Sequence, residues 1–357
     1  MTWTRCWLVI WVLGILLSGT AAWGQEETLQ LTLAVEHDIG FDCPVASAAD
    51  SASNLLWVLM DNCFEGDYWL QAYTLTTGDP IADATISLDT IDSDIYRIES
   101  SVTPLASIND TTLELIVYHQ DDYRLARFEI DTETGAMTLN QQASEQLNTT
   151  LLEHTDYPEF ATYSPDHQYA LASDDTQSYL IDLASSQPLK VFDDPFTFAA
   201  FSTDMQLVYA TRFEEPDNYD NYNAFLSIYA LDTLPDGAPL RELLIASAFV
   251  YPSPDGQYLA LHIGDDRLGV LAVDSGVISS PLDIWEPTRK ALTCVNSGAD
   301  LSDVDFMVSG RLVLTALQWL PDSSGFWTLN SYGGEGAAGG RPCYFDYSRL
   351  RQYQIAR

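Results

Sequence analysis

The stretch Ser253-Pro254-Asp255-Gly256 stands just before the apolar run Tyr258-Leu259-Ala260-Leu261. Proline presets the backbone for a turn, the aspartate side chain accepts hydrogen bonds from nearby backbone N–H groups, and glycine allows a positive φ. The run that follows has the aromatic and aliphatic residues that favour a strand. The stretch therefore predicts a tight turn that leads into a β-strand.

Related stretches recur along the chain, and each again precedes an apolar run. The clearest are Tyr163-Ser164-Pro165-Asp166, Phe201-Ser202-Thr203-Asp204 and Trp319-Leu320-Pro321-Asp322. With two weaker copies included, the predicted turn aspartates are Asp50, Asp110, Asp166, Asp204, Asp255 and Asp322, separated by 60, 56, 38, 51 and 67 residues. We interpret these aspartates as structural turn residues, and the uneven spacing as insertions in loops rather than in strands.

Repetition of a turn and a strand at intervals of tens of residues predicts an all-β fold, and specifically a β-propeller. Six turns indicate six blades of four antiparallel strands, and seven blades is the alternative if one gap contains a blade without the turn stretch. We expect residues 29–35 to close the ring by pairing with residues 351–355, since closure removes exposed sheet edges. The best helical candidate is the short, polar stretch Gln141–Leu152.

The turn stretch and the strand after it resemble the TolB-type and WD-repeat-like β-propeller families, over roughly residues 40 to 354. The Trp-Asp and Gly-His dipeptides of true WD repeats are absent from this sequence. The hydrogen-bond network of those repeats is therefore not carried over. The resemblance implies a ring of four-stranded blades that serves as a binding platform.

Residues 1–24 have the pattern of a signal peptide. Arg5 is followed by an apolar run over residues 6–17, and small residues precede a cleavage site after Gly24. The run is shorter than the ~20 residues that span a bilayer; an uncleaved N-terminal anchor is the alternative. We expect residues 25–357 to form a single propeller domain that is secreted or periplasmic, monomeric and without a membrane span.

Four cysteines lie outside this signal peptide, namely Cys43, Cys63, Cys294 and Cys343. An even number in an exported protein predicts disulfides, with three connectivities open. The pairs Cys43–Cys63 and Cys294–Cys343 are favoured, because each pair falls within one predicted blade. Their spacing does not match a zinc site.

The charge of the chain is strongly negative, with 52 acidic and 15 basic residues and a formal net charge of −37. Nucleic acids and anionic membranes need Lys and Arg to displace their counterions, so both are excluded as partners. Two interpretations of the acidity stay open. It keeps the protein soluble through self-repulsion, or it provides affinity for cations or for a basic partner.

Motifs for catalysis or cofactor binding are scarce. The sequence contains neither Gly-x-Ser-x-Gly nor His-Glu-x-x-His, and its five histidines are scattered. Acidic residues at 214–221 and 300–305 are candidates for calcium, but neither segment has EF-hand spacing. The glycine-rich segment 333–340 is predicted to be a surface loop. We therefore expect no cofactor, with calcium as the alternative.

Three functions are compatible with these residues. The leading hypothesis is a non-catalytic exported module that binds a protein or another extracellular ligand. The second is a propeller enzyme that acts on glycans or small molecules through carboxylates in the channel, with or without calcium. The third is a structural protein of the cell envelope whose acidic face binds cations.

Overall fold

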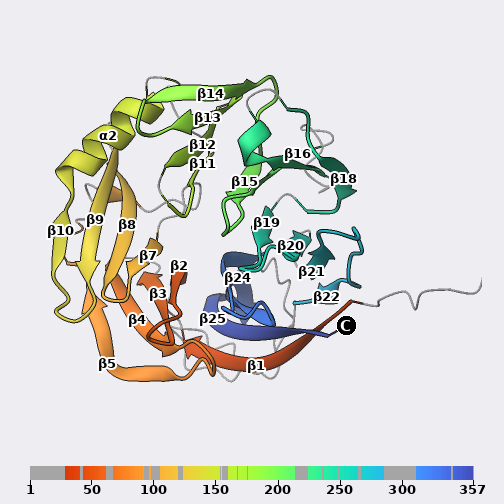
Figure 1. Ribbon diagram of the computed structural model, residues 1–357. Coiled ribbons are helices and arrows are strands. Elements are labelled where there is room, and N and C mark those ends of the chain that lie inside the picture. Colours follow the sequence, from red (N-terminus) through yellow and green to blue (C-terminus); the bar gives the residue numbers. More distant parts are fainter. Residues whose placement is uncertain are drawn as a thin grey trace, which may run out of the picture.

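The computed structural model describes residues 29–40, 43–61, 67–89, 91, 96–97, 105–119, 124–152, 154, 160–166, 168–174, 176–213, 224–234, 237–247, 249–263, 267–284, 311–338 and 341–356. Six antiparallel sheets are arranged as blades around a central opening (Figure 1). The prediction of an all-β propeller with six four-stranded blades is confirmed. One blade carries an additional short strand.

The first three blades follow one another along the chain. The first contains β2 (Cys43–Asp50), β3 (Leu55–Asp61), β4 (Tyr68–Thr74) and β5 (Pro80–Ser87). The second contains β6 (Tyr96–Arg97), β7 (Leu105–Asn109), β8 (Thr112–His119), β9 (Leu125–Asp131) and β10 (Met137–Leu139), with both β6 and β7 paired to β8. The third contains β11 (Phe160–Tyr163), β12 (Tyr169–Ser173), β13 (Ser178–Asp182) and β14 (Gln187–Phe192).

The other three blades complete the ring. The fourth contains β15 (Phe198–Phe201), β16 (Leu207–Phe213), β17 (Ala224–Ala230) and β18 (Arg241–Ile245), with a 3-10 turn, η1 (Leu231–Thr233), after β17. The fifth contains β19 (Phe249–Pro252), β20 (Tyr258–Ile263), β21 (Arg267–Ala272) and β22 (Leu282–Asp283). The sixth combines β23 (Arg311–Trp319), β24 (Gly325–Ala338) and β25 (Arg341–Ala356) with β1 (Gln30–Gly40).

The ring closes through the two ends of the described chain. Strand β1 pairs antiparallel with β25, and Leu31 lies opposite Ile355 while Glu36 lies opposite Arg351. The predicted pairing of residues 29–35 with residues 351–355 is confirmed. The last blade is thus built from both ends of the chain, so closing the ring requires the N-terminal strand.

The hydrophobic core is divided into six clusters, one between each pair of neighbouring blades. The unbroken apolar run of β3 is explained by the packing of both its faces. Leu56 and Val58 pack toward the sixth blade, whereas Trp57 and Leu59 pack toward the second. Successive side chains of a strand point to opposite faces, and here both faces are covered by a blade.

The helix α2 (Gln141–Leu152) forms where the sequence predicts it. It follows β10 and lies at the periphery of the ring, between β10 and β14 (Figure 1). Asn140 caps its N-terminus, because the side-chain oxygen accepts the N–H of Ala143 at 3.0 Å. Leu147 and Leu151 are buried between the second and third blades, so the helix fills space that the two blades leave between them.

The glycine-rich segment differs from its prediction. Strand β24 continues through Ala338, and its pairing with β25 includes Gly334 opposite Phe345 and Ala338 opposite Arg341. The predicted loop is therefore wrong for residues 333–338. The backbone pairing with β25 extends through this segment, although glycine has a low strand propensity.

No helix in the described part of the chain is both long enough and apolar enough to span a membrane.

Candidate functional site

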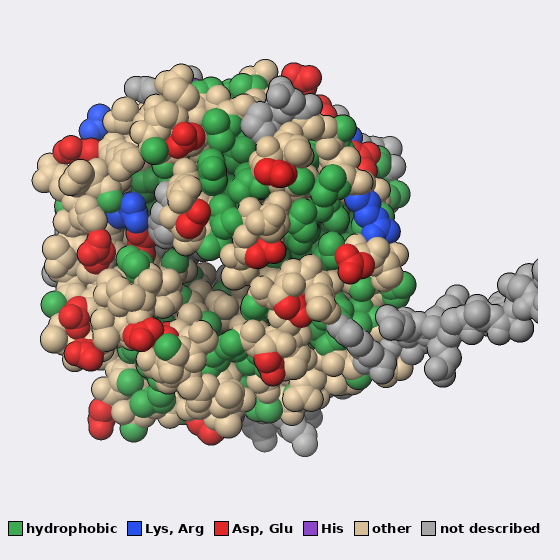
Figure 2. Space-filling view, viewed as in Figure 1, with side chains coloured by type: hydrophobic (Ala, Val, Ile, Leu, Met, Phe, Trp, Pro, Cys, Tyr) green, Lys and Arg blue, Asp and Glu red, His purple; other side chains and the backbone are tan. Residues whose placement is uncertain are grey.

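The six predicted turn aspartates occupy equivalent places in the fold. Each lies where the first strand of its blade leads into the second. Asp50 is the last residue of β2, and the others follow β7, β11, β15, β19 and β23, for Asp110, Asp166, Asp204, Asp255 and Asp322 respectively. The blades repeat one orientation around the ring, so these turns emerge on one face, which we call the turn face. Acidic side chains are spread around the central opening of the propeller (Figure 2).

Three of the turns share one hydrogen-bond pattern. A serine hydroxyl donates to Oδ1 of the aspartate two residues later at 2.7 Å, in the pairs Ser164–Asp166, Ser202–Asp204 and Ser253–Asp255. The same serine oxygen accepts the N–H of the residue five positions later at 2.9 Å, namely Tyr169, Leu207 and Tyr258. The serine thus connects the aspartate to the start of the next strand. This role of the serine was not predicted from the sequence, although the Ser-x-Asp spacing is present in all three copies.

The remaining turns vary this pattern. At Asp322, where Leu320 replaces the serine, Ser324 donates its hydroxyl and its N–H to Oδ1 at 2.7 and 3.0 Å. Both hydrogen bonds lower the pKa of Asp322 below its usual range, and the hydrogen bond from the hydroxyl has the larger effect. Asp50 is buried, and its Oδ1 accepts the N–H of Ala52 at 3.0 Å.

The turn of the second blade uses a different acceptor from the one predicted. The acceptor is Asn109, the residue before Asp110. Its side-chain oxygen accepts the N–H of Thr111 at 3.0 Å. Asn and Asp side chains are interchangeable in this kind of turn, because both offer an oxygen at the same reach.

The turn face is strongly charged. Its aspartates are exposed to solvent, except Asp50. At Asp166, Asp204 and Asp255 the hydrogen bonds of the turn are accepted by Oδ1. These carboxylates can therefore hold the turn and keep their negative charge at the surface. Like charges repeated around one opening produce a negative potential over that face.

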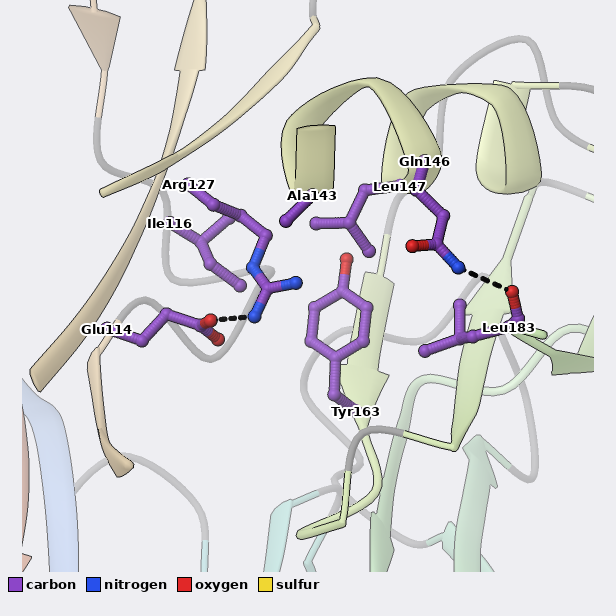
Figure 3. Close-up of a pocket in the computed structure, with 8 residues that line it drawn as sticks. All are labelled: Glu114, Ile116, Arg127, Ala143, Gln146, Leu147, Tyr163 and Leu183. Carbon is purple, nitrogen blue, oxygen red and sulfur yellow. Dashed lines mark hydrogen bonds and ion pairs between the residues drawn. The ribbon is translucent and has the colours of Figure 1, made fainter. Parts of the chain in front are cut away.

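A second candidate site is a cavity between the second and third blades, beneath helix α2 (Figure 3). Its volume is about 40 Å³. Glu114 and Ile116 of β8, Arg127 of β9 and Tyr163 of β11 form its inner side. The helix contributes Ala143, Gln146 and Leu147, and Leu183 completes the wall. The cavity combines a polar group of side chains with an apolar surface.

The charged residues of the cavity form a pair. A terminal nitrogen of Arg127 contacts Oε2 of Glu114, whose side chain is only 3% exposed. Burial lowers the pKa of the Arg127 guanidinium and raises the pKa of the Tyr163 hydroxyl. Both shifts leave the neutral-pH states unchanged, with arginine charged and tyrosine neutral. The charges of Glu114 and Arg127 therefore cancel within the site.

The described histidines lie against aromatic rings at separate places. The ring of His37 is 6.3 Å from that of Trp327, and the ring of His119 is 5.8 Å from that of Tyr96. His37 also contacts the carbonyl oxygen of Thr77 at 2.8 Å, which links the sixth blade to the first. This arrangement fits a role in packing.

Several predicted sites lie outside the described residues. These are Cys63, Cys294, and the side chains of Cys43 and Cys343, so the disulfides stay a prediction. The calcium candidates at 214–221 and 300–305 also lie outside. Among the residues that the structure does describe, no group of three or more His, Cys, Asp or Glu side chains is placed to hold a metal ion.

No family model matches this chain, and no curated protein matches it.

Proposed function

We propose that this protein is an exported, non-catalytic binding module, and that its turn face binds a basic protein partner. The observation that carries the proposal is the position of Asp110, Asp166, Asp204, Asp255 and Asp322, exposed on one face of the ring. A surface of one charge sign around an opening attracts ligands of the opposite sign and increases their rate of association.

The chemistry of the described carboxylates favours binding over catalysis. Oδ1 of Asp166, Asp204 and Asp255 accepts hydrogen bonds that hold the turn. A general acid or base needs a pKa near the working pH, and the resolved shift at Asp322 is in the opposite direction. The ring form of the protein, with a packed core between all blades, offers a rigid support for such a face.

Export and family membership belong to the same proposal. Residues 1–24 support export, and the recurring turn stretch supports a place among TolB-type or WD-repeat-like propellers. If the signal peptide is cleaved as predicted, mass spectrometry of exported protein will show an N-terminus at Gln25. A mass that includes residues 1–24 would contradict cleavage.

The binding proposal is tested with a charge-neutralised turn face. In the variant Asp166→Asn, Asp204→Asn, Asp255→Asn and Asp322→Asn, each side chain keeps the Oδ1 acceptor of its turn but loses its charge. The probe is a fluorescent deca-lysine peptide, measured by anisotropy at 0.05 to 0.3 M NaCl. We expect at least tenfold weaker binding to the variant, because four charges are removed from one surface.

A control variant removes the same charge elsewhere. Asp83→Asn, Glu145→Gln, Asp193→Asn and Asp283→Asn also neutralise four exposed acids, each outside the six turns. If the turn face binds the peptide, this control retains most of the affinity. Equal losses in the two variants would show that only the net charge matters and would reject the turn face as the site.

A further inference from the structure

We propose that the cavity between the second and third blades is a binding site for a small neutral amide group. The site is separate from the turn aspartates and does not depend on the function proposed for them. Three polar groups converge on it from three elements: Arg127 on β9, Tyr163 on β11 and Gln146 on α2.

The orientation of these groups indicates which hydrogen-bonding groups the ligand carries. The second terminal nitrogen of Arg127 and the Tyr163 hydroxyl point into the space beneath the helix, and so does the side-chain oxygen of Gln146 (Figure 3). The Gln146 nitrogen donates to the carbonyl oxygen of Leu183 at 2.9 Å, which fixes its oxygen toward the cavity. Arginine and tyrosine offer donors to a carbonyl oxygen, whereas the glutamine oxygen accepts an N–H. An amide carries both a carbonyl oxygen and N–H groups.

The charge of the site selects a neutral ligand over a carboxylate. The Arg127 charge is already balanced by Glu114, whose side chain is 3% exposed. A carboxylate would bring an additional negative charge next to buried Glu114, in a chain with a net charge of −37. Such a charge would have no cation of its own, and burying it is costly. An amide forms comparable hydrogen bonds without that penalty.

The size of the site limits the ligand to one such group. A volume of about 40 Å³ holds roughly three water molecules, since one water needs about 10 to 15 Å³ on the same measure. The three heavy atoms of an amide occupy a similar space. Leu147 and Ile116 provide an apolar surface for the attached carbon.

The test uses isotope-labelled full-length protein and NMR titration with acetamide, acetate and the peptide Ala-Gln-Ala. We expect saturable shifts at the Gln146 side-chain amide and the Arg127 Nε resonance with acetamide. Acetate at the same concentration will leave them unchanged. Binding of the peptide as well would indicate an amide side chain of a partner protein as the source. Binding of acetamide alone would indicate a free small molecule.

Two variants and a control distinguish the cavity from the helix surface. Ala143→Leu fills the cavity, and Gln146→Met removes the acceptor at an exposed helix position that tolerates the change. Gln146→Met should weaken acetamide binding about fivefold, a typical effect of one lost hydrogen bond, and Ala143→Leu should weaken it at least as much because the leucine occupies the space of the ligand. Gln142→Leu adds the same side chain as Ala143→Leu at a neighbouring exposed position and should bind normally. An absence of saturable shifts, or equal shifts with acetate, would overturn the proposal.

Discussion

At the scale of single residues, the serine of the turn is as important as the aspartate. Ser253 is fully buried, donates to Asp255 and accepts the N–H of Tyr258. The aspartate is exposed and has water as an alternative partner, whereas the Tyr258 N–H is buried and does not. The stability of the turn therefore depends more on the serine than on the aspartate, although the aspartate is easier to recognise in the sequence.

This difference predicts the effect of removing one hydroxyl. Ser253→Ala should lower the free energy of unfolding by about 2 kcal/mol, because a buried N–H loses its acceptor. Ser185→Ala, at an exposed position, should change it by less than about 0.5 kcal/mol. Urea unfolding followed by circular dichroism measures both values. Equal effects of the two substitutions would show that the buried hydrogen bond contributes nothing.

At the scale of elements, the turns differ in what packs against them. Gly78 lies between β4 and β5 with φ of 72°, and Gly256 lies between β19 and β20 with φ of 70°. A Cβ atom at Gly78 would lie 2.8 Å from Cδ2 of His37 and would contact the buried ring of Trp327. A Cβ atom at Gly256 would meet nothing within 4 Å. One turn is enclosed by the sixth blade, and the other is open.

The two glycines form a matched pair for mutation. Gly256→Ala should lower the free energy of unfolding by about 1 kcal/mol, which is the conformational cost of a positive φ. Gly78→Ala should lower it by about 3 kcal/mol, because it adds a steric clash with the neighbouring blade. Chemical denaturation gives the difference directly. Similar losses at both sites would mean that Trp327 and His37 move aside without cost.

At the scale of the whole molecule, three basic residues connect neighbouring blades of an acidic protein. Lys190 of the third blade donates to the carbonyl oxygen of Gly237 at 3.0 Å, and Arg241 of the fourth donates to that of Val273 at 2.8 Å. Arg351 of the closing blade donates to the carbonyl oxygen of Ile284 at the end of the fifth blade, at 2.6 Å. Within its own blade, Arg351 also donates to Glu36 of β1 at 2.6 Å. These contacts oppose the repulsion between negative charges distributed around the ring.

Self-repulsion predicts a particular response to salt. An increase from 0.02 to 0.3 M NaCl should raise Tm by about 2 °C or more, equivalent to roughly 1 kcal/mol for a chain of this size, because screening weakens the repulsion between exposed carboxylates. The variant with four neutral turn aspartates should show a smaller rise. Differential scanning calorimetry measures both. A Tm that falls with salt would mean that attractive ion pairs dominate the surface.

The sequence by itself determined the repeat and therefore the architecture. Turn residues such as Asp166 and Asp255, and the apolar strands after them, are local signals, because a turn needs only neighbouring residues. Six turns predicted six blades, and the removal of exposed sheet edges predicted that residues 29–35 close the ring. Gln141–Leu152 was the best helical candidate. The loop prediction for the glycine-rich segment was wrong, because the pairing of β24 with β25 depends on a partner strand rather than on local propensity.

Only the tertiary structure decided which polar residues meet. Glu114, Arg127, Gln146 and Tyr163 come from three strands and a helix, and no spacing in the sequence relates them. The helix brings them together because it fills the space between the second and third blades and packs against both. Likewise, the aspartates were recognisable as turn residues, but their common face follows from the orientation that the closed ring imposes on every blade. Interactions between neighbouring residues determine the turns and strands of this protein, and the closure of the ring determines which polar residues come together in its two candidate sites.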